Sequence, residues 1–97
     1  MEESARSQEL LQTDVALKLG LNHRQLALVR HALDRPGTVY SIKLHRNYHN
    51  VSYQTARTDL LELSRFELLD KKKVGREFMF FIPDSLRQRL EQHERNE

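Results

Sequence analysis

The 97-residue sequence contains no cysteine, no tryptophan, only three glycines and only two prolines. Without cysteine the chain has no disulfide, no zinc-thiolate site and no thiol nucleophile, which suits a reducing compartment. It also has no signal-peptide pattern and no apolar run long enough to span a bilayer. The glycines never form a phosphate-cradling run. We therefore expect a soluble, cytoplasmic protein without membrane contact.

The length and composition predict one small domain with a modest core. Hydrophobic residues make up 38% of the chain, which is too little for a large buried active-site cleft. The formal net charge is only +2, but residues 21–83 carry eleven basic and six acidic groups. The segments on either side, residues 1–20 and 84–97, are both net acidic. Positive charge concentrated in the middle of the chain is typical of polyanion binding.

Residues 52–63 organise the rest of the sequence. Ser52 is a helix-capping residue type, and three apolar residues follow at helical spacing: Ala56, Leu60 and Leu63. The opposite face carries an unusual set for a merely solvated surface: Tyr53, Gln54, Arg57 and Thr58. Such side chains contact phosphates and base edges, and Arg and Gln can do so bidentately. We interpret residues 52–63 as the recognition helix of a helix-turn-helix.

Two helices are expected at the start of the chain. Residues 1–20 read as a linker with a short amphipathic packing helix, which Gly20 ends in the left-handed conformation. The next helix runs from Asn22 to about Asp34, because Asn22 and Gln25 are placed to form a capping box. Its inward face is expected to carry Leu26, Val29 and Leu33.

A short strand and the first helix of the helix-turn-helix come next. Residues 38–40 are β-branched or aromatic and favour a strand. Ser41 can cap a helix over residues 42–48, with His45 toward the core. Asn50 tolerates the left-handed conformation that the following turn requires. A short helix, a tight turn and a capped helix make a helix-turn-helix.

After residue 63 the pattern changes to a hairpin. We predict a first strand that begins over residues 66–69, a basic loop over residues 71–76, and a second strand over residues 78–82. In the second strand Met79 and Phe81 share one face by the two-residue period. The last helix, about residues 85–93, is expected to cover that face. An alternative is that Met79 and Phe81 form a dimer surface.

The sequence resembles a known family at these positions. The run Ser52-Tyr53-Gln54-Thr55-Ala56-Arg57-Thr58-Asp59-Leu60, then Leu68-Leu69 and Val74-Gly75-Arg76, is similar to the winged-helix domain at the C-terminus of Fic-family proteins. The likeness covers residues 21–83, although Asn50 stands where glycine is commoner and the wing is short. Fic proteins transfer AMP using a His-Pro-Phe core and a Gly-Asn-Gly-Arg run, and this chain contains neither. The resemblance implies a regulatory or targeting module cut from a Fic-type AMP-transferring protein, with an upstream catalytic domain as partner.

The predicted fold is mainly α, a winged helix-turn-helix over residues 21–83 with a small β-hairpin wing. A helix in residues 1–20 and another in residues 84–97 flank its three-helix core. The predicted function is that of a bacterial-type transcription regulator, sequence-selective binding of duplex DNA with the recognition helix in the major groove. We predict these DNA-binding residues: Ser52, Tyr53, Gln54, Thr55, Arg57, Thr58, Lys71, Lys72, Lys73 and Arg76.

The roles differ within that set. Arg57 and Gln54 are expected to read bases, while Tyr53, Thr55 and Thr58 touch phosphate or a thymine methyl group. The wing lysines and Arg76 are expected to hold phosphates.

A different class of function stays open. The Tyr53 face or the Met79–Phe81 surface could instead dock a catalytic domain, another protein or a second copy, without DNA binding. The wing lysines have a simpler interpretation as well, because lysines at hairpin edges aid solubility and block edge pairing.

The chain shows no catalytic grouping, so we expect no enzyme activity and no cofactor. His45 and His49 stand four residues apart but lack a third ligand, so no metal site is expected. Asp59 is expected to be structural, paired with a nearby arginine or lysine.

Overall fold

The computed structural model describes residues 18–95. Their elements follow in the order α2 (His23–Asp34), β1 (Val39–Ser41), α3 (Ile42–His49), α4 (Tyr53–Arg65), β2 (Asp70–Val74), β3 (Glu77–Phe81) and α5 (Leu86–Arg95). Residues 1–17, which hold most of the predicted N-terminal helix, lie outside the described part. Its predicted end is confirmed, because Lys18 and Leu19 are helical and Gly20 has a φ of +71°. None of the helices described in residues 18–95 has the length and hydrophobicity that a membrane-spanning helix requires.

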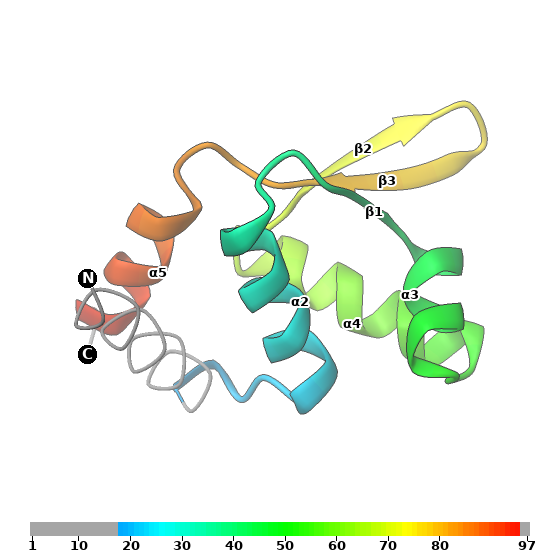
Figure 1. Ribbon diagram of the computed structural model, residues 1–97, viewed down its shortest axis with the longest axis horizontal. Coiled ribbons are helices and arrows are strands. Elements are labelled where there is room, and N and C mark those ends of the chain that lie inside the picture. The colour runs from blue at the N-terminus through cyan, green and yellow to red at the C-terminus, as the bar shows by residue number, and fades with distance from the viewer. Residues whose placement is uncertain (1–17, 96–97) are drawn as a thin grey trace.

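The three strands form one antiparallel sheet in the order β1-β3-β2. Val39 pairs with Phe81 at the root of the sheet, and Val74 pairs with Glu77 beside the tip of the β2–β3 hairpin. Figure 1 shows α2, α4 and α5 on one side of this sheet, with α3 at the end toward which the hairpin extends. The β2–β3 hairpin, residues 70–81, is called the wing below.

Side-chain caps begin the three central helices as the residue types predicted. The Asn22 side chain accepts from the Gln25 backbone N–H, and the Asn22 N–H donates to Gln25 Oε1 at 2.9 Å, which completes the capping box. The Ser41 and Ser52 hydroxyls each accept a backbone N–H from the first turn of α3 and of α4. Asn50 has a φ of +53°, so α3 ends in the left-handed conformation before the turn.

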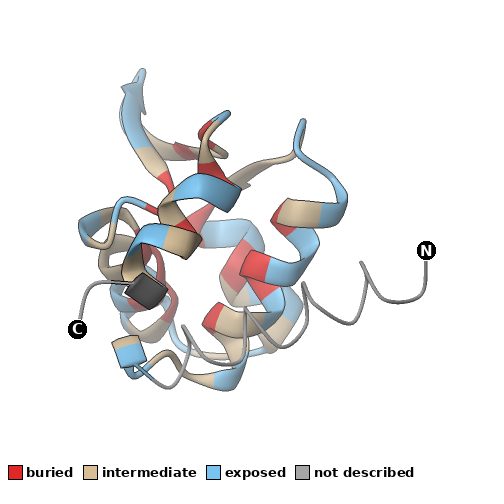
Figure 2. Ribbon diagram, turned by 90° about the vertical axis from the view of Figure 1, so that its left-hand side faces the viewer, coloured by how far each residue is buried: buried red, intermediate tan, exposed pale blue. Residues whose placement is uncertain are grey.

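The core lies where these helices meet the sheet, and in Figure 2 the buried residues gather there. The predicted inward face of α4 is confirmed, because Ala56, Leu60 and Leu63 are all fully buried. The inward face of α2 is partly different from the prediction. Its buried residues are Gln25, Leu28, Val29 and Ala32, while Leu26 and Leu33 are half-buried. The i, i+3, i+4, i+7 stripe on α2 therefore begins at the capping glutamine.

The predicted boundaries of the first strand of the hairpin were wrong. Residues 66–69 are turn, and Leu68 and Leu69 are buried in the core cluster. The strand begins only at Asp70 and contains Lys71, Lys72 and Lys73, although the sequence pattern predicts a loop at these lysines. Pairing with β3 forms this strand despite the low strand propensity of lysine. The tip is reduced to Gly75 and Arg76.

The prediction that α5 covers Met79 and Phe81 was wrong, because α5 packs on the other face of the sheet. Leu86 and Leu90 of α5 are buried in the core cluster. The helix is anchored to the α4–β2 turn, where Arg89 Nη1 donates to the Glu67 carbonyl at 2.7 Å and His93 Nε2 donates to the Phe66 carbonyl at 2.8 Å. On the opposite face of the sheet Met79 and Phe81 stay half-buried.

Glu67, a non-glycine residue outside the helix-turn-helix, has a left-handed backbone conformation. Glu67 has a φ of +63°, in the turn that carries the Leu68 N–H to the Leu63 carbonyl. Because this conformation is strained for residues with a Cβ atom, we expect Glu67→Gly to raise the free energy of unfolding by about 0.5–1 kcal/mol. Urea denaturation checks this. Glu67→Ala is the matched control, since it removes the carboxylate but keeps the strain, and an equal gain in both variants would contradict the explanation.

Candidate nucleic-acid interface

The exposed face of α4 carries four of the predicted DNA-binding residues. Tyr53, Gln54, Arg57 and Thr58 are all exposed, and they lie on one face because the spacing is i, i+1, i+4, i+5. Within residues 18–95, none of the four side chains makes a hydrogen bond or an ion pair. The Arg57 guanidinium therefore has its five N–H donors available to another molecule.

Ser52 and Thr55 are engaged in the cap instead. The Ser52 hydroxyl accepts the Thr55 backbone N–H at 3.1 Å and donates to Thr55 Oγ1 at 2.9 Å. Thr55 is half-buried, whereas Ser52 is exposed. These two residues set where α4 begins, and the exposed Ser52 hydroxyl oxygen lies beside the free first-turn N–H groups.

The electrostatics of the α4 N-terminus favour an anion. Its first turn contains no acidic residue, so no side-chain charge offsets the positive end of the helix dipole. Asp59, the nearest acidic residue along α4, is buried on the opposite face. A phosphate that approaches from the Tyr53 side meets donors and no carboxylate from the first two turns of α4.

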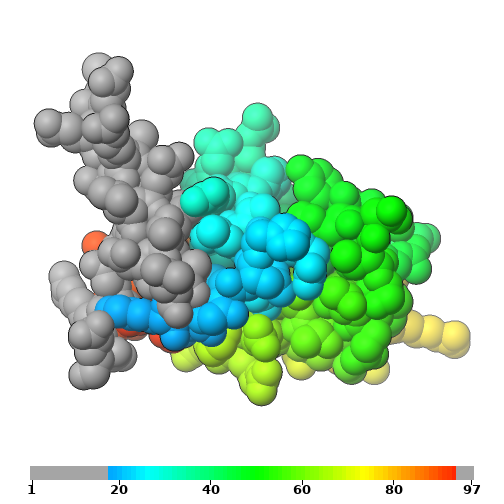
Figure 3. Space-filling view, turned by 90° about the horizontal axis from the view of Figure 1, so that it is seen from below, coloured from blue at the N-terminus to red at the C-terminus, as the bar shows by residue number. Residues whose placement is uncertain are grey.

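The wing adds exposed cations near the helix-turn-helix. Lys71, Lys72, Lys73 and Arg76 are all exposed, and Figure 3 shows the tip of the wing projecting past the segment that contains α3. Their register puts Lys72 on the face of Met79 and Phe81, and Lys71 and Lys73 on the other face. The Lys72 ammonium lies 5.3 Å from the Phe81 ring centroid, and that of Lys71 lies 4.9 Å from Phe78. These rings hold the lysine side chains along the strand while leaving their ammonium groups exposed.

Asp59 fixes the orientation of α4 by binding residues of both α2 and α3. From α2, Arg24 Nε donates to Asp59 Oδ2 at 2.7 Å. The N-cap residue of α2, Asn22, donates from Nδ2 to Oδ1 at 2.9 Å. From α3, His45 Nε2 lies 3.0 Å from Oδ2. We call this group, Asp59 with Asn22, Arg24 and His45, the Asp59 clamp.

The predicted pairing of Asp59 with an arginine is confirmed, but the clamp is larger than predicted. Burial by itself would raise the pKa of Asp59, since its side chain is only 3% exposed. Hydrogen bonds from Arg24, Asn22 and His45 outweigh burial and hold this pKa below its ordinary value. The same hydrogen bond from Arg24 raises the arginine's pKa. The sequence contains a signal for the burial of Asp59, because its helical position falls between Ala56 and Leu63 on the inward face.

Gln25 extends the contact between α2 and α4. Its Nε2 donates to the Asp59 backbone carbonyl at 3.1 Å and to Glu62 Oε1 at 3.0 Å. One glutamine therefore caps α2 through Oε1 and bonds α4 through Nε2. Together with the Asp59 clamp it holds the middle of α4 at Asp59 and Glu62.

The two histidines of α3 take separate parts in this arrangement. His45 is buried and belongs to the clamp, while His49 is half-buried with its ring centroid 4.7 Å from that of His45. Burial, followed by repulsion from His45 and Arg24, lowers the pKa of His49. Within residues 18–95 no group of three or more histidine or acidic side chains could hold a metal ion.

Comparison with known proteins shows the fold. No family model and no curated protein matches the chain. Among solved structures, the ST1889 protein of the archaeon Sulfolobus tokodaii has a TM-score of 0.76 at 11% identity, over 91% of this chain and 87% of that one. A Methanosarcina mazei protein described as a possible transcriptional regulator has a TM-score of 0.65 at 12% identity, over 84% and 73%. The YusO protein of Bacillus subtilis has a TM-score of 0.57 at 10% identity, over 95% and 69%.

The chain has a winged-helix fold. The helix-turn-helix of α3 and α4, followed by the wing, carries this assignment, and the likeness to the three structures agrees with it. The fold class predicted from the sequence is thus confirmed. None of the comparisons links the chain to Fic proteins.

Proposed function

We propose that this winged helix binds duplex DNA, with α4 in the major groove and the wing along the phosphate backbone. The observation that carries the proposal is the exposed face of α4, where Tyr53, Gln54, Arg57 and Thr58 have no partner within the described chain and no acidic neighbour in the first turn. Exposed helices of proteins that bind no nucleic acid also carry charged and polar side chains. However, an arginine and a glutamine at i, i+3 beside a lysine-rich hairpin offer the donors that base edges and phosphates accept.

The core supports the same function. The Asp59 clamp and Gln25 hold α4 from its inward side, which leaves its outward side rigid and accessible. A helix held in this way enters a groove without losing much conformational freedom. Arg57 and Gln54 then read base edges, Tyr53 and Thr58 contact phosphate or a thymine methyl group, and Lys71, Lys72, Lys73 and Arg76 neutralise phosphates.

In this proposal the domain is the regulatory or targeting part of a transcription regulator that acts in the cytoplasm. Support for a Fic-type parent protein comes only from the sequence resemblance over residues 21–83, which is most specific at residues 52–60. Support for regulation comes from the Methanosarcina mazei structure, whose description as a possible transcriptional regulator concerns that protein.

Fluorescence anisotropy of labelled random duplex DNA tests the proposal. We expect micromolar binding at 50 mM salt that weakens about tenfold or more at 200 mM, because the wing lysines and Arg76 release counterions from the phosphates. Charge-reversed Lys71→Glu/Lys72→Glu/Lys73→Glu should abolish binding at either salt concentration. An absence of binding at 50 mM salt would refute the function and turn attention to protein partners of the α4 face.

A further inference from the structure

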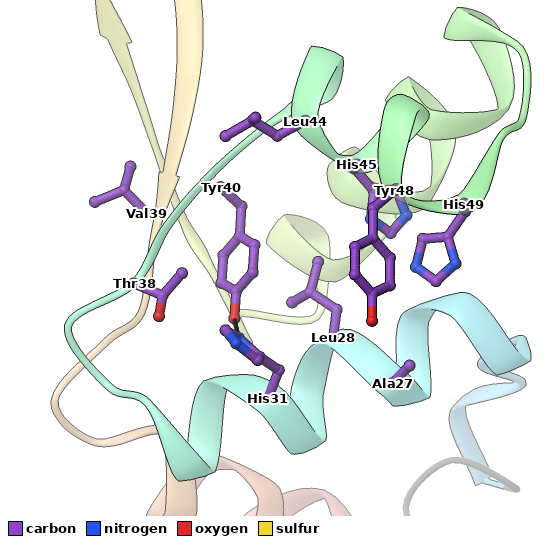
Figure 4. Close-up of a pocket in the computed structure, with 10 residues that line it drawn as sticks. All are labelled: Ala27, Leu28, His31, Thr38, Val39, Tyr40, Leu44, His45, Tyr48 and His49. Atoms are coloured by element: carbon purple, nitrogen blue, oxygen red, sulfur yellow. Dashed lines mark hydrogen bonds between the residues drawn. The ribbon is translucent and has the colours of Figure 1, made fainter.

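A cavity of about 340 Å³ lies between α2, β1 and α3, away from the exposed face of α4. Figure 4 shows the Tyr40 and Tyr48 rings pointing from β1 and α3 toward α2, on which Ala27, Leu28 and His31 lie. Tyr48 is 83% exposed and Leu44, one helical turn before it, is 59% exposed. Two large side chains therefore stand open to solvent at the rim of a cavity that they do not fill.

The lining selects by shape and lacks charged groups. Its ten residues include two tyrosines and three histidines but no aspartate, glutamate, lysine or arginine. Rings that line a cavity favour flat aromatic ligands, which they can contact face to face or edge to face. A charged ligand would lose its hydration there without gaining an ion pair. The volume lies at the small end of ligand sites, which suits a molecule of one or two rings.

Polar groups in the lining can orient such a ligand. The Tyr40 hydroxyl lies 2.7 Å from His31 Nδ1, beside Thr38, and burial raises the pKa of Tyr40 to about 12. It therefore stays an un-ionised phenol that can share a hydrogen bond. The exposed Tyr48 hydroxyl and the His49 ring, which burial helps to keep neutral, are further partners for a ring N–H or O–H group.

One lining residue connects the cavity to the DNA-binding helix. His45 lines the cavity and its Nε2 lies 3.0 Å from Asp59 Oδ2 of α4. A ligand in contact with the His45 ring thus touches a group that holds α4 in place. The His45 side chain therefore links occupancy of the cavity to the orientation of α4.

We propose that the cavity between α2, β1 and α3 binds a small, uncharged heteroaromatic molecule, and that its binding weakens DNA binding through His45 and the Asp59 clamp. The second half of this inference rests on the proposed DNA-binding function. The first half does not.

Indole is a suitable probe, because it is flat, uncharged and carries one N–H donor. In amide NMR spectra of the free protein we expect indole to shift resonances of the lining residues on α2, β1 and α3, with a dissociation constant of about 0.1–1 mM. The anion indole-3-acetate, the cation tryptamine and the non-aromatic cyclohexanol should each bind at least about fivefold more weakly, because the lining offers rings and no charge partner.

A matched pair of variants locates the site. Ala27 is an exposed residue of α2 that lines the cavity, so Ala27→Phe should fill the cavity and weaken indole binding about tenfold or more. Arg30→Phe places the same ring on an exposed position of α2 outside the lining and should leave indole binding unchanged. Tyr48→Ala removes an exposed wall and should also weaken binding.

The effector role is read from DNA affinity. At saturating indole, the dissociation constant for DNA should rise about fivefold or more in the wild type and stay constant in Ala27→Phe. Unchanged or tighter DNA binding would overturn the effector role.

Two results would overturn the cavity site itself. One is the absence of shifts in the lining residues. The other is a set of shifts that depends on protein concentration and not on indole, because a second copy would then occupy this face. If the wild type binds indole but no DNA, the DNA-binding function and the effector role fail together, while the cavity site stands.

Discussion

Asp59→Asn is expected to lower the free energy of unfolding by about 3 kcal/mol, the largest stability effect that we predict for one side chain of the helix-turn-helix. The substitution keeps the size of the side chain but removes the negative charge that Arg24 faces at 2.7 Å. The Arg24 side chain is only 19% exposed, so water replaces little of the lost interaction. The new amide also directs an N–H₂ group at donors from Asn22, Arg24 or His45, whichever way it turns.

Urea denaturation at neutral pH measures this change, and Asp84→Asn serves as its control. Asp84 is exposed and makes no ion pair within residues 18–95, so the control changes the net charge equally without touching the core. We expect the control to stay within about 0.5 kcal/mol of the wild type. A loss below about 1 kcal/mol for Asp59→Asn would show that the clamp positions α4 without stabilising the fold.

The same carboxylate gives the fold a defined pH dependence. Because the pKa of Asp59 is lower in the folded state than in the unfolded chain, its stabilising effect is complete above the unfolded value of about 4. That effect is lost as the pH falls from there through the folded pKa. The difference in the free energy of unfolding between the wild type and Asp59→Asn should therefore narrow below about pH 4.

Arg57→Ala is expected to cost about 1–3 kcal/mol of binding free energy on a selected DNA site and to relax the preference at one base position. The side chain is exposed and makes no hydrogen bond or ion pair within the described part of the chain, so we expect its removal to leave the fold unchanged. Lys72→Ala should instead weaken all duplexes alike and reduce the slope of log K against log salt by about 1. Site selection followed by anisotropy titrations on the selected and a random duplex separates these two effects. Equal losses of binding free energy on both duplexes for Arg57→Ala would contradict the base-reading role.

Local capping chemistry made much of this fold predictable from the sequence. Asn22, Ser41 and Ser52 begin their helices as predicted, and Asn50 supplies the left-handed turn, because each of these conformations depends on a few neighbouring residues. The inward face of α4 was also predictable, since Ala56, Leu60 and Leu63 are apolar at helical spacing.

Features that depend on distant residues were not predictable in the same way. Three consecutive lysines are typical of a loop, and residues 71–73 form a strand only because they pair with β3. The prediction that α5 covers Met79 and Phe81 was based on the apolar character of these two residues alone. The position of α5 is instead set by Arg89 and His93, which bond backbone carbonyls of the α4–β2 turn. For the candidate site, periodicity identified the exposed face of α4. The base and phosphate contacts themselves stay predictions.

The sheet is built unevenly along its length, with a consequence for how the wing moves. At its root β3 has a strand on each side, since Phe81 is paired with both Val39 and Asp70. Beyond Met79 only β2 remains beside it, and residues 71–77 are exposed. Local opening is easiest where few buried contacts hold the backbone. The outer wing can therefore bend or fray on its own as it follows a curved surface, while its root stays locked into the rest of the domain.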